Sequence, residues 1–381
     1  MSIEYRFIEP LDVLFLRGNK LFGDPGSYGE CLIPPWPSVA AGAIRSRMLV
    51  DNRVDLTAFA DNKIEHESLG TPANPGSFTL AGFHLARRQG DMAEILMPPP
   101  ADLVVSRDRS GSLEVSALRP LATALASSFP LGQPPVLAQG TERSKPESGY
   151  WLTQQGWSDY LKGTLPTAAQ LVHSSELWVF DSRVGIGMDR ATRHVEEGKL
   201  FTAQAVAMQP GVGFVAAVSG ALPPEDGLLR LGGDGRAAAI TPARVSLPQP
   251  DYQQLVAERR CRVVLNSPGL FPQGWKLPGT DADQRVNLPG GITARLVSAA
   301  VPRAETLSGW DLAARKPKPA QKVVPAGSLY WLDELEATPE ALGKLVAGGL
   351  WDESCKDGVD RARRAEGFNR ISLAAWPNER D

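Results

Sequence analysis

Hydrophobic and polar positions alternate most regularly in the middle of the chain, after an apolar run at 177–180. Apolar side chains there take every second position and are separated by glycine, in the order Val184, Gly185, Ile186, Gly187 and Met188. A two-residue period indicates a strand. A dense polar run follows at 189–199, and residues 200–206 again have the pattern of a strand. The pattern predicts a long β-hairpin with a charged tip, and its alternate glycines predict a bare face that a ligand or another backbone can approach.

The formal charges of this predicted hairpin balance. Between residues 181 and 201 there are four basic and four acidic side chains: Arg183, Arg190, Arg193 and Lys199, with Asp181, Asp189, Glu196 and Glu197. The segment is therefore not a simple polycation. A solvated loop with internal ion pairs is one interpretation of it.

The first fifty residues predict a strand, a loop and a helix. Residues 5–9 alternate as a strand does, and residues 17–37 are rich in glycine and proline. A helix is expected over 38–49 with Ser38 as its N-cap, because a serine side chain accepts a hydrogen bond from a free N–H of the first turn. A helix N-terminus beside a glycine-bearing loop can cradle a phosphate.

Further elements are expected in both halves of the chain. Strands are predicted at 213–218, 236–241, 259–265, 292–301, 323–332 and 367–376. Thr338 is expected to cap a helix that has Pro339 in its first position and ends at Gly348. Residues 50–170 alternate short strands with proline and glycine clusters, which indicates an elaborated insertion. Three prolines over 242–250 indicate a linker.

The predicted fold class is α+β. Each half can be laid out as β-α-β-β-α-β, the ferredoxin-like motif, although no first helix is evident in the second half. We therefore expect two ferredoxin-like domains with β-hairpin and loop insertions. The first would cover residues 1–248, with a large insertion at about 50–205, and the second residues 249–381.

The composition is that of a globular chain in a reducing compartment. Hydrophobic residues make up 43% of 381 residues, and the formal net charge of −3 argues against a free-standing, non-specific nucleic-acid binder. Cys31, Cys261 and Cys355 are far apart and form no CxxC pair. This argues against a zinc site or a disulfide framework and for a cytoplasmic location. No signal-peptide pattern occurs, and no apolar run approaches the roughly 18 residues of a membrane span.

Motifs for catalysis are lacking, so no catalytic residue, metal or cofactor is predicted. The sequence has no GxxxxGK[ST], no GxSxG and no HExxH. Histidine is the side chain that ordinarily titrates near neutral pH, and only four occur: His66, His84, His173 and His194. Of these, His194 beside Arg193 is the one candidate for a general base, and a solvated loop histidine is the plainer interpretation.

A basic stretch lies in the second half. Residues 295–322 contain two acids, Glu305 and Asp311, and six basic side chains: Arg295, Arg303, Arg315, Lys316, Lys318 and Lys322. Within it, Pro317 and Pro319 exclude a regular helix over the segment ARKPKPAQK (314–322), so we expect this segment to be an exposed basic loop suited to phosphates. A second, shorter patch precedes Gly367 and consists of Arg361, Arg363 and Arg364.

Five stretches of the chain, in this order, resemble a known family. They are LFLRGNKLFG (14–23), IPPWPSVAAGAIRSRM (33–48), VGIGMDRATRHVEEGKLF (184–201), RLGGDGR (230–236) and KPKPAQKVVPAGSLYWL (316–332). Together they resemble the Cas5-like RAMP subunits of the type III-B CRISPR effector, the Cmr complex. The resemblance covers nearly the whole chain and is weakest at about 50–170.

This resemblance implies two ferredoxin-like (RRM-like) RAMP domains and no catalysis. It also implies binding of the 5′ handle of CRISPR RNA, with the large polymerase-like Cmr subunit and a backbone RAMP subunit as partners in antiviral defence. The chain departs from the family at the C-terminal glycine-rich loop. RAMP proteins often have G-F-G there, whereas this chain has Gly367, Phe368 and Asn369. Asparagine tolerates a positive φ, so we expect the turn to survive.

Phosphate contacts, stacking and base-edge hydrogen bonds are what single-stranded RNA ends require. The side chains expected to meet RNA are Arg17, Lys20, Ser38, Arg45, Arg47, Arg183, Arg190, Arg193, His194, Lys199, Arg295, Lys316, Lys318 and Lys322. Candidates for stacking are Phe22, Tyr28 and Trp36. The hairpin would lie alongside the RNA, with its ion pairs rearranged on binding.

Two other functions compete with this interpretation. One is a RAMP endoribonuclease that cuts precursor CRISPR RNA, with His194 as the base and Arg190 or Arg193 stabilising charge. The scarcity of histidine weighs against it. The other is a protein scaffold whose basic loops face acidic partner surfaces.

Overall fold

The computed structural model describes seven stretches of the chain: residues 2–16, 28–123, 126–137, 145–189, 191–311, 313–351 and 358–376. It shows a mixed α+β protein, as the sequence predicts. Within these stretches no helix is long and apolar enough to cross a membrane.

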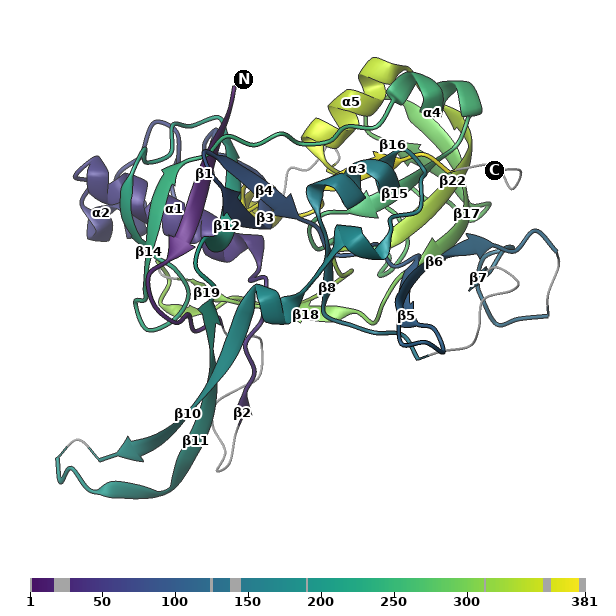
Figure 1. Ribbon diagram of the computed structural model, residues 1–381. Helices are drawn as coiled ribbons and strands as arrows, with labels where there is room; N and C mark the ends of the chain where they lie inside the picture. Colours follow the sequence, from purple (N-terminus) through teal and green to yellow (C-terminus); the bar gives the residue numbers. More distant parts are fainter. Residues whose placement is uncertain are drawn as a thin grey trace. The chain divides into compact units, whose positions relative to one another are not determined.

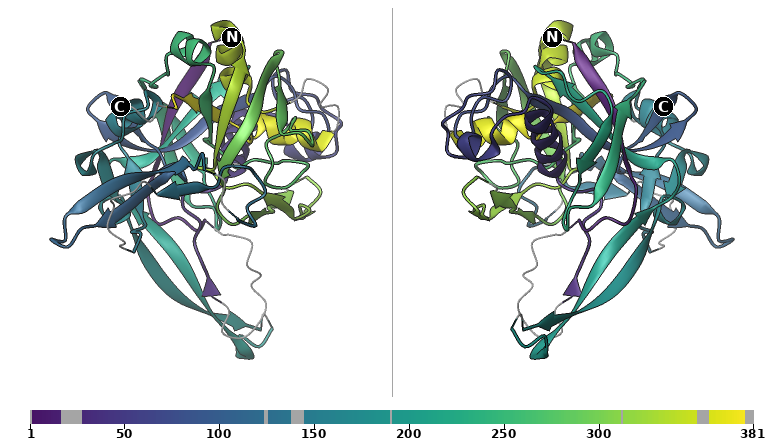
Figure 2. Two further views of the ribbon diagram at one scale, coloured as in Figure 1. Left: turned by 90° about the vertical axis from the view of Figure 1, so that its right-hand side faces the viewer. Right: turned by 90° about the vertical axis from the view of Figure 1, so that its left-hand side faces the viewer.

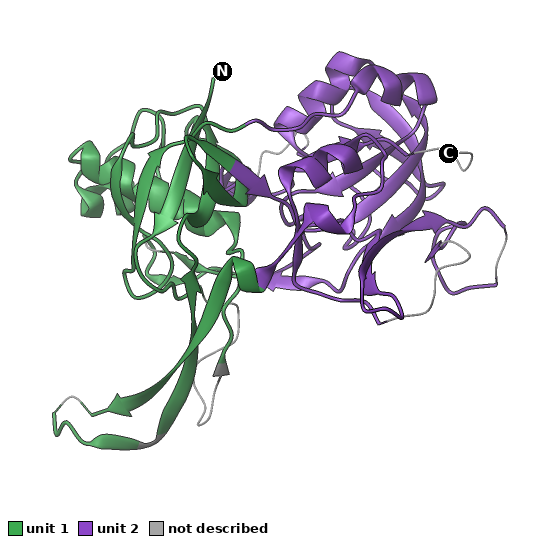
Figure 3. Cartoon of the chain, in the orientation of Figure 1, with its two compact units in different colours: residues 1–93, 175–245, 307–320 green, residues 94–174, 246–306, 321–381 purple. Residues whose placement is uncertain are grey.

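Two compact units make up the fold, and each combines segments that are far apart in sequence (Figure 3). Unit 1 contains residues 1–93, 175–245 and 307–320, and unit 2 contains residues 94–174, 246–306 and 321–381. Within unit 2, the Arg262 guanidinium lies 2.8 Å from the Asp102 carboxylate, and the Ala375 N–H donates to the Leu161 carbonyl. These bonds attach segment 94–174 to the second half of the chain. The grouping therefore differs from the single break at 248 expected from the sequence.

Unit 1 is built on a six-stranded sheet (Figure 1). In spatial order its strands are β13 (Gly227–Arg230), β14 (Ala237–Pro242), β1 (Ile3–Pro10), β12 (Val212–Ser219), β3 (Thr79–Gln89) and β4 (Met92–Leu96). The neighbours Phe7 and Ile8 of β1 are both fully buried. Because adjacent residues of a strand point to opposite faces, both faces of the sheet are covered at its centre.

Helix α1 (Pro37–Asp51) contacts β3 and β13 and is followed by the short α2 (Leu56–Ala60). The prediction that Ser38 caps α1 was wrong, because Trp36 occupies the cap position and no side chain caps the helix. Proline suits the first helical position, since the N–H that it lacks would have no partner there, and the helix therefore begins at Pro37. The helix packs through Pro37, Ala40, Ala41, Ile44, Met48 and Leu49.

The predicted hairpin is confirmed and is longer than expected. Strands β10 (Trp178–Met188) and β11 (Val195–Met208) pair antiparallel, and β2 (Tyr28–Gly29) pairs with β11. Figures 1 and 2 show β10 and β11 extending from unit 1 as a long arm. At its base, Leu14 bonds with Val206 through both backbone N–H groups.

Unit 2 is built on a five-stranded sheet. Its strands, in spatial order, are β16 (Arg285–Leu288), β17 (Ile292–Ala300), β22 (Leu329–Glu336), β15 (Cys261–Leu265) and β23 (Ile371–Ala374). Its helices are α3 (Gln154–Leu161), α4 (Tyr252–Glu258), α5 (Pro339–Gly348) and α6 (Gly358–Ala365). The core joins Val263 and Tyr330 of the sheet to Leu345 of α5. The prediction for α5 is confirmed, since the Thr338 hydroxyl accepts the Ala341 N–H at 3.2 Å.

Smaller elements complete the fold. In unit 2 they are β5 (Leu103–Arg107), β6 (Leu113–Pro120), β7 (Pro135–Leu137), β8 (Tyr150–Leu152), β9 (Leu171–His173) and the 3-10 turns η1 (Ala168–Gln170) and η2 (Ser174–Glu176). Two further ladders pair β18 (Glu305–Leu307) with β21 (Gln321–Val323), and β19 (Trp310–Asp311) with β20 (Lys316–Pro317).

The full β-α-β-β-α-β layout is found in neither sheet. The fully described connection from β12 to β14 holds strand β13 and no helix, and the one from β15 to β17 holds strand β16 and no helix. Each sheet therefore keeps one helix of the expected pair: α1 follows β1 in unit 1, and α5 precedes β23 in unit 2.

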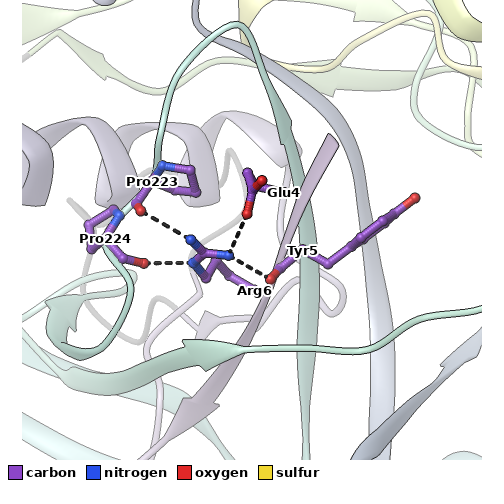
Figure 4. Close-up of polar contacts among 5 residues, drawn as sticks. All are labelled: Glu4, Tyr5, Arg6, Pro223 and Pro224. Atoms are coloured by element: carbon purple, nitrogen blue, oxygen red, sulfur yellow. Dashed lines mark hydrogen bonds and ion pairs between the residues drawn. The ribbon is translucent and has the colours of Figure 1, made fainter. Parts of the chain in front are cut away.

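A buried arginine side chain stabilises unit 1. In unit 1, Arg6 is 7% exposed and donates from Nε to the Pro224 carbonyl at 2.7 Å and from Nη2 to the Pro223 carbonyl at 3.3 Å (Figure 4). Its Nη1 also contacts Glu4 at 3.3 Å. Buried carbonyls need such donors, so Arg6 holds the loop before β13 against the first strand.

Candidate nucleic-acid interface

The tip of the arm is a turn ordered by Asp189. Its carboxylate accepts the N–H groups of Ala191 and Thr192 at 3.0 and 2.7 Å and the Thr192 hydroxyl at 2.8 Å. The bonds from Thr192 lower the pKa of the Asp189 carboxyl. Arg193 adopts a φ of 55°, and Arg193 and His194 are both exposed. The tip therefore exposes the Arg193 guanidinium and the His194 imidazole on a turn that the hydrogen bonds to Asp189 hold in place.

The bare glycine face predicted from the sequence does not exist. A Cβ added to Gly185 would meet the ring of Phe201, and one added to Gly187 would lie 2.6 Å from Cβ of Lys199. Both side chains come from the opposite strand β11, so the glycines make room for their own hairpin rather than for a ligand. Lys199 also forms an ion pair with Glu196.

The opposite face of the arm is apolar and exposed. Its side chains are Phe180, Val184, Ile186 and Met188 of β10 and Leu200 of β11, each between 46% and 71% exposed. The sequence showed this alternation but not that both faces of the two strands lie in solvent. Exposed apolar patches of this kind mark interaction surfaces.

Toward the base of the arm, charge sits next to an aromatic ring. Arg183 forms an ion pair with Asp181 at 2.9 Å, and its guanidinium lies 5.9 Å from the centre of the Phe15 ring. Arg236 also lies over Phe15, at 5.1 Å, and pairs with Asp12 at 2.6 Å. Arg183 therefore already has structural contacts within unit 1.

The predicted residues of α1 differ in their surroundings. Ser38 and Arg45 are half-buried. Arg47 donates to Asp51 and to the carbonyl of Leu228, both at 2.7 Å. These bonds tie α1 to β13, so the Arg47 guanidinium has a structural role in the fold.

Lys316 and Lys318 lie on the β19–β20 hairpin, which is part of unit 1. The prediction that residues 314–322 are non-helical is confirmed, and most of them are exposed, whereas Lys318 is half-buried. Sequence reasoning missed Trp310, which pairs with Pro317 across the hairpin and is 57% exposed. The signal was available, because an aromatic residue stands within a few positions of four cations.

The predicted residues do not all fall in one unit. Ser38, Arg45, Arg47, Arg183, Arg193, His194, Lys199, Lys316 and Lys318 belong to unit 1, and Arg295 and Lys322 belong to unit 2. Arg295 pairs with Glu334 at 2.9 Å, and Lys322 is exposed. Arg17, Lys20, Arg190 and Phe22 lie outside the described residues, as does the side chain of Tyr28.

The C-terminal glycine loop keeps its turn. Asn369 has a φ of 58°, accepts the Leu270 N–H at 2.6 Å and donates to the Leu350 carbonyl at 3.2 Å. The expectation that asparagine preserves this turn is confirmed. The adjacent basic patch is partly structural, because Arg363 is buried and pairs with Glu366 at 2.9 Å. Burial, together with Arg364, lowers the pKa of Arg370 to about 10.

In the part of the chain that the structure describes, no three His, Cys, Asp or Glu side chains are grouped so that they could hold a metal ion. His194 is exposed, and its backbone carbonyl accepts the Asp189 N–H at 2.9 Å. His84 lies half-buried in β3, and burial lowers its pKa to about 4. These histidines come from separate elements of unit 1.

The fold and these surfaces define an α+β protein with two main sheets, a long β-arm and exposed cations on its turns. A family model described as CRISPR-associated protein (Cas_Cmr3) matches residues 6–376, so the chain belongs to this family, the Cas5-like RAMP subunits of type III-B Cmr complexes. No curated protein sequence matches the chain.

Two solved structures are similar to it along their whole length. One is titled "Cryo-EM structure of the Type III-B Cmr-beta bound to cognate target RNA and AMPPnP, state 1". It has 14% sequence identity and a TM-score of 0.51, and 97% of this chain and 98% of that chain are covered. The other, titled "Cryo-EM structure of the Type III-B Cmr-beta bound to cognate target RNA", has 13% identity and a TM-score of 0.49, covering 97% and 96%. The first similarity supports a shared fold.

Proposed function

We propose that this chain is a non-catalytic subunit of a type III-B effector that binds the 5′ handle of CRISPR RNA. In the assembled complex it docks the large polymerase-like subunit onto the backbone of RAMP subunits. The observation that carries this proposal is the family match over residues 6–376. The complex named in the similar structure with a TM-score of 0.51 is bound to target RNA, which supports an RNA-containing Cmr complex as the setting of this chain.

The strand orders support a ferredoxin-like origin for both sheets. In unit 1 the first strand β1 lies between β12 and β14, with β3 beyond β12. In unit 2 the first strand β15 lies in the same way between β22 and β23, with β17 beyond β22. The same arrangement thus recurs twice, each time with one helix replaced by a strand. This equivalence is what a pair of RAMP domains would give.

The RNA surface that we propose lies on unit 1. Arg193 and His194 at the tip of the arm supply charge and hydrogen-bond donors, and Lys316 adds a second exposed cation from another segment of the same unit. The half-buried Ser38 stands in the first turn of α1, where backbone N–H groups favour anions. Ion pairs such as Lys199 with Glu196 would have to open for these groups to bind phosphate.

The decisive experiment measures guide affinity and thermal midpoint for the double variant R190A/R193A in the assembled complex. Charge-assisted phosphate bonds are worth roughly 1.5–3 kcal/mol each before solvent exposure reduces them, so guide affinity should fall by about tenfold or more. Thermal stability should hardly change, because exposed loop charges contribute little to folding. R285A in β16 is a matched control, since Arg285 is exposed but lies in unit 2.

Unchanged affinity of R190A/R193A, or a loss that only follows a lower thermal midpoint, would contradict RNA binding by the arm. The same preparations also test the two competing functions. Specific cleavage of a repeat-containing transcript that disappears in H194A would identify an endoribonuclease. Failure of the assembled chain to crosslink to guide RNA would identify a protein scaffold.

A further inference from the structure

A small hairpin in unit 1 displays a tryptophan. β19 and β20 pair Trp310 with Pro317 and Asp311 with Lys316. The hairpin is closed by the Lys318 N–H, which donates to the Gly309 carbonyl at 2.8 Å, and by the Asp311 carboxylate, which accepts the Ala314 N–H at 2.9 Å. Trp310 is therefore held on a hydrogen-bonded turn instead of on a chain end.

Trp310 stands apart from the other tryptophans. The chain has nine, all in described positions, and the remaining eight are buried or half-buried, whereas Trp310 is 57% exposed. Burying an indole is strongly favourable, so a ligand that covers the Trp310 ring would gain free energy by removing it from water. An isolated exposed aromatic residue would carry little weight, but this one has charged neighbours.

Two cations stand on the same small hairpin as the exposed indole, with Lys316 opposite Asp311. Arg315 and Lys316 are both exposed, and neither forms an ion pair with a described residue. Arg315 adopts a φ of 51° at the turn. The one acid of the hairpin, Asp311, already accepts a backbone hydrogen bond. An exposed ring and unpaired cations on one hairpin match single-stranded nucleic acid, whose bases stack and whose phosphates need positive charge.

We propose that Trp310, Arg315 and Lys316 form a stacking site for an unpaired RNA base. The base lies on the indole, and the two cations contact the flanking phosphates. The site rests on the proposed function, because the ligand is taken to be the single-stranded part of the guide RNA. It adds a base-binding element to the exposed cations that the proposed function assigns to unit 1.

The test separates stacking from charge. The probe is a single-stranded RNA of the guide's 5′ sequence that carries 2-aminopurine at successive positions, titrated into the complex assembled without its own guide. W310L keeps an apolar side chain but removes the ring, and should lower affinity by about 5- to 100-fold without changing the salt slope. It should also abolish the stacking-induced quenching at one position. W310F should retain most of both signals.

K316Q should behave in the opposite way. Removing one phosphate contact should reduce the slope of log K against log salt by about 0.7 and leave the quenching in place. L222A is the control for surface change, because Leu222 is 79% exposed in the same unit. Thermal midpoints of all variants should agree, since every changed side chain is exposed.

The outcomes distinguish this inference from the function on which it rests. Guide binding by the wild type with unchanged affinity and quenching in W310L would overturn the stacking site and leave the proposed function intact. Absence of guide binding in the wild type would overturn both. Unchanged guide binding together with loss of another subunit from W310L complexes would show that Trp310 contacts protein, which also overturns the proposal.

Discussion

Unit 2 contains a buried ion pair whose removal should be costly. Asp102 is 1% exposed and Arg262 is 6% exposed, and they meet at 2.8 Å. Arg262 also donates to the carbonyls of Ala375 at 2.8 Å and Tyr160 at 3.1 Å, and its guanidinium lies 4.1 Å from the centre of the Tyr160 ring. The Tyr160 hydroxyl donates to Asp102 at 2.8 Å.

Replacing Asp102 by alanine leaves the guanidinium buried without a counter-charge. Breaking a buried pair in this way costs about 3–5 kcal/mol. For a unit of this size each kcal/mol lowers the thermal midpoint by about 2–4 °C, so D102A should unfold roughly 6–20 °C earlier. D102N keeps an acceptor for Tyr160 and should lose less.

The double variant D102L/R262M tests the cause. It removes both charges and gives up the bonds to two carbonyls, which are worth about 1 kcal/mol each. It should therefore be more stable than D102A by about 2 kcal/mol. Calorimetry and urea unfolding of the four proteins measure these differences. A cost below about 1 kcal/mol for D102A, or a double variant that is no more stable than D102A, would refute the reasoning.

Three further predictions concern the sheet, the arm and the glycine loop. His84 has a pKa of about 4 in the fold, against an ordinary value of about 6.5, so the unfolded chain binds a proton at higher pH than the folded chain does. The contribution of His84 to the free energy of unfolding should therefore be full above pH 6.5 and decrease as the pH falls toward 4. The loss should be about 1–2 kcal/mol, since the ring keeps some exposure. Unfolding of H84Q at pH 4.5 and 7 should show less of this loss, and an equal loss would contradict the assignment. G185A should push the Phe201 ring off the arm and speed amide exchange around it by about fivefold, with G42A in the open side of α1 as control. N369G should be more stable than N369A by about 1–2 kcal/mol, because alanine disfavours a φ of 58°, and equal thermal midpoints of the two variants would contradict this cost of the positive φ.

Local sequence was sufficient for elements whose cause is local. The alternation at 184–188 and the strand pattern at 200–206 predicted the arm, and Thr338 with Pro339 predicted the start of α5. The positive φ at Asn369 was also foreseen from the residue type. Side-chain period, capping and backbone preference act over a few residues, so a sequence displays them directly.

Tertiary structure decided which of the predicted charged side chains and surfaces are free to bind a ligand. Arg47 and Arg363 look like surface cations in the sequence, yet one bonds a carbonyl of β13 and the other is buried against Glu366. The alternate glycines of the arm predicted a bare face, but Phe201 and Lys199 of the opposite strand fill it. Apart from Glu366, which stands three positions after Arg363, each partner lies outside the local window in which periodicity and capping are read.

The sequence by itself determined the family resemblance, the α+β class and the long charged hairpin. Only the tertiary structure grouped residues 94–174 with the second half, returned residues 307–320 to unit 1, and left Trp310 exposed. Grouping and exposure depend on contacts between residues a hundred or more positions apart, such as Asp102 with Arg262. No local pattern specifies such contacts, because they form only when the whole chain closes around its core.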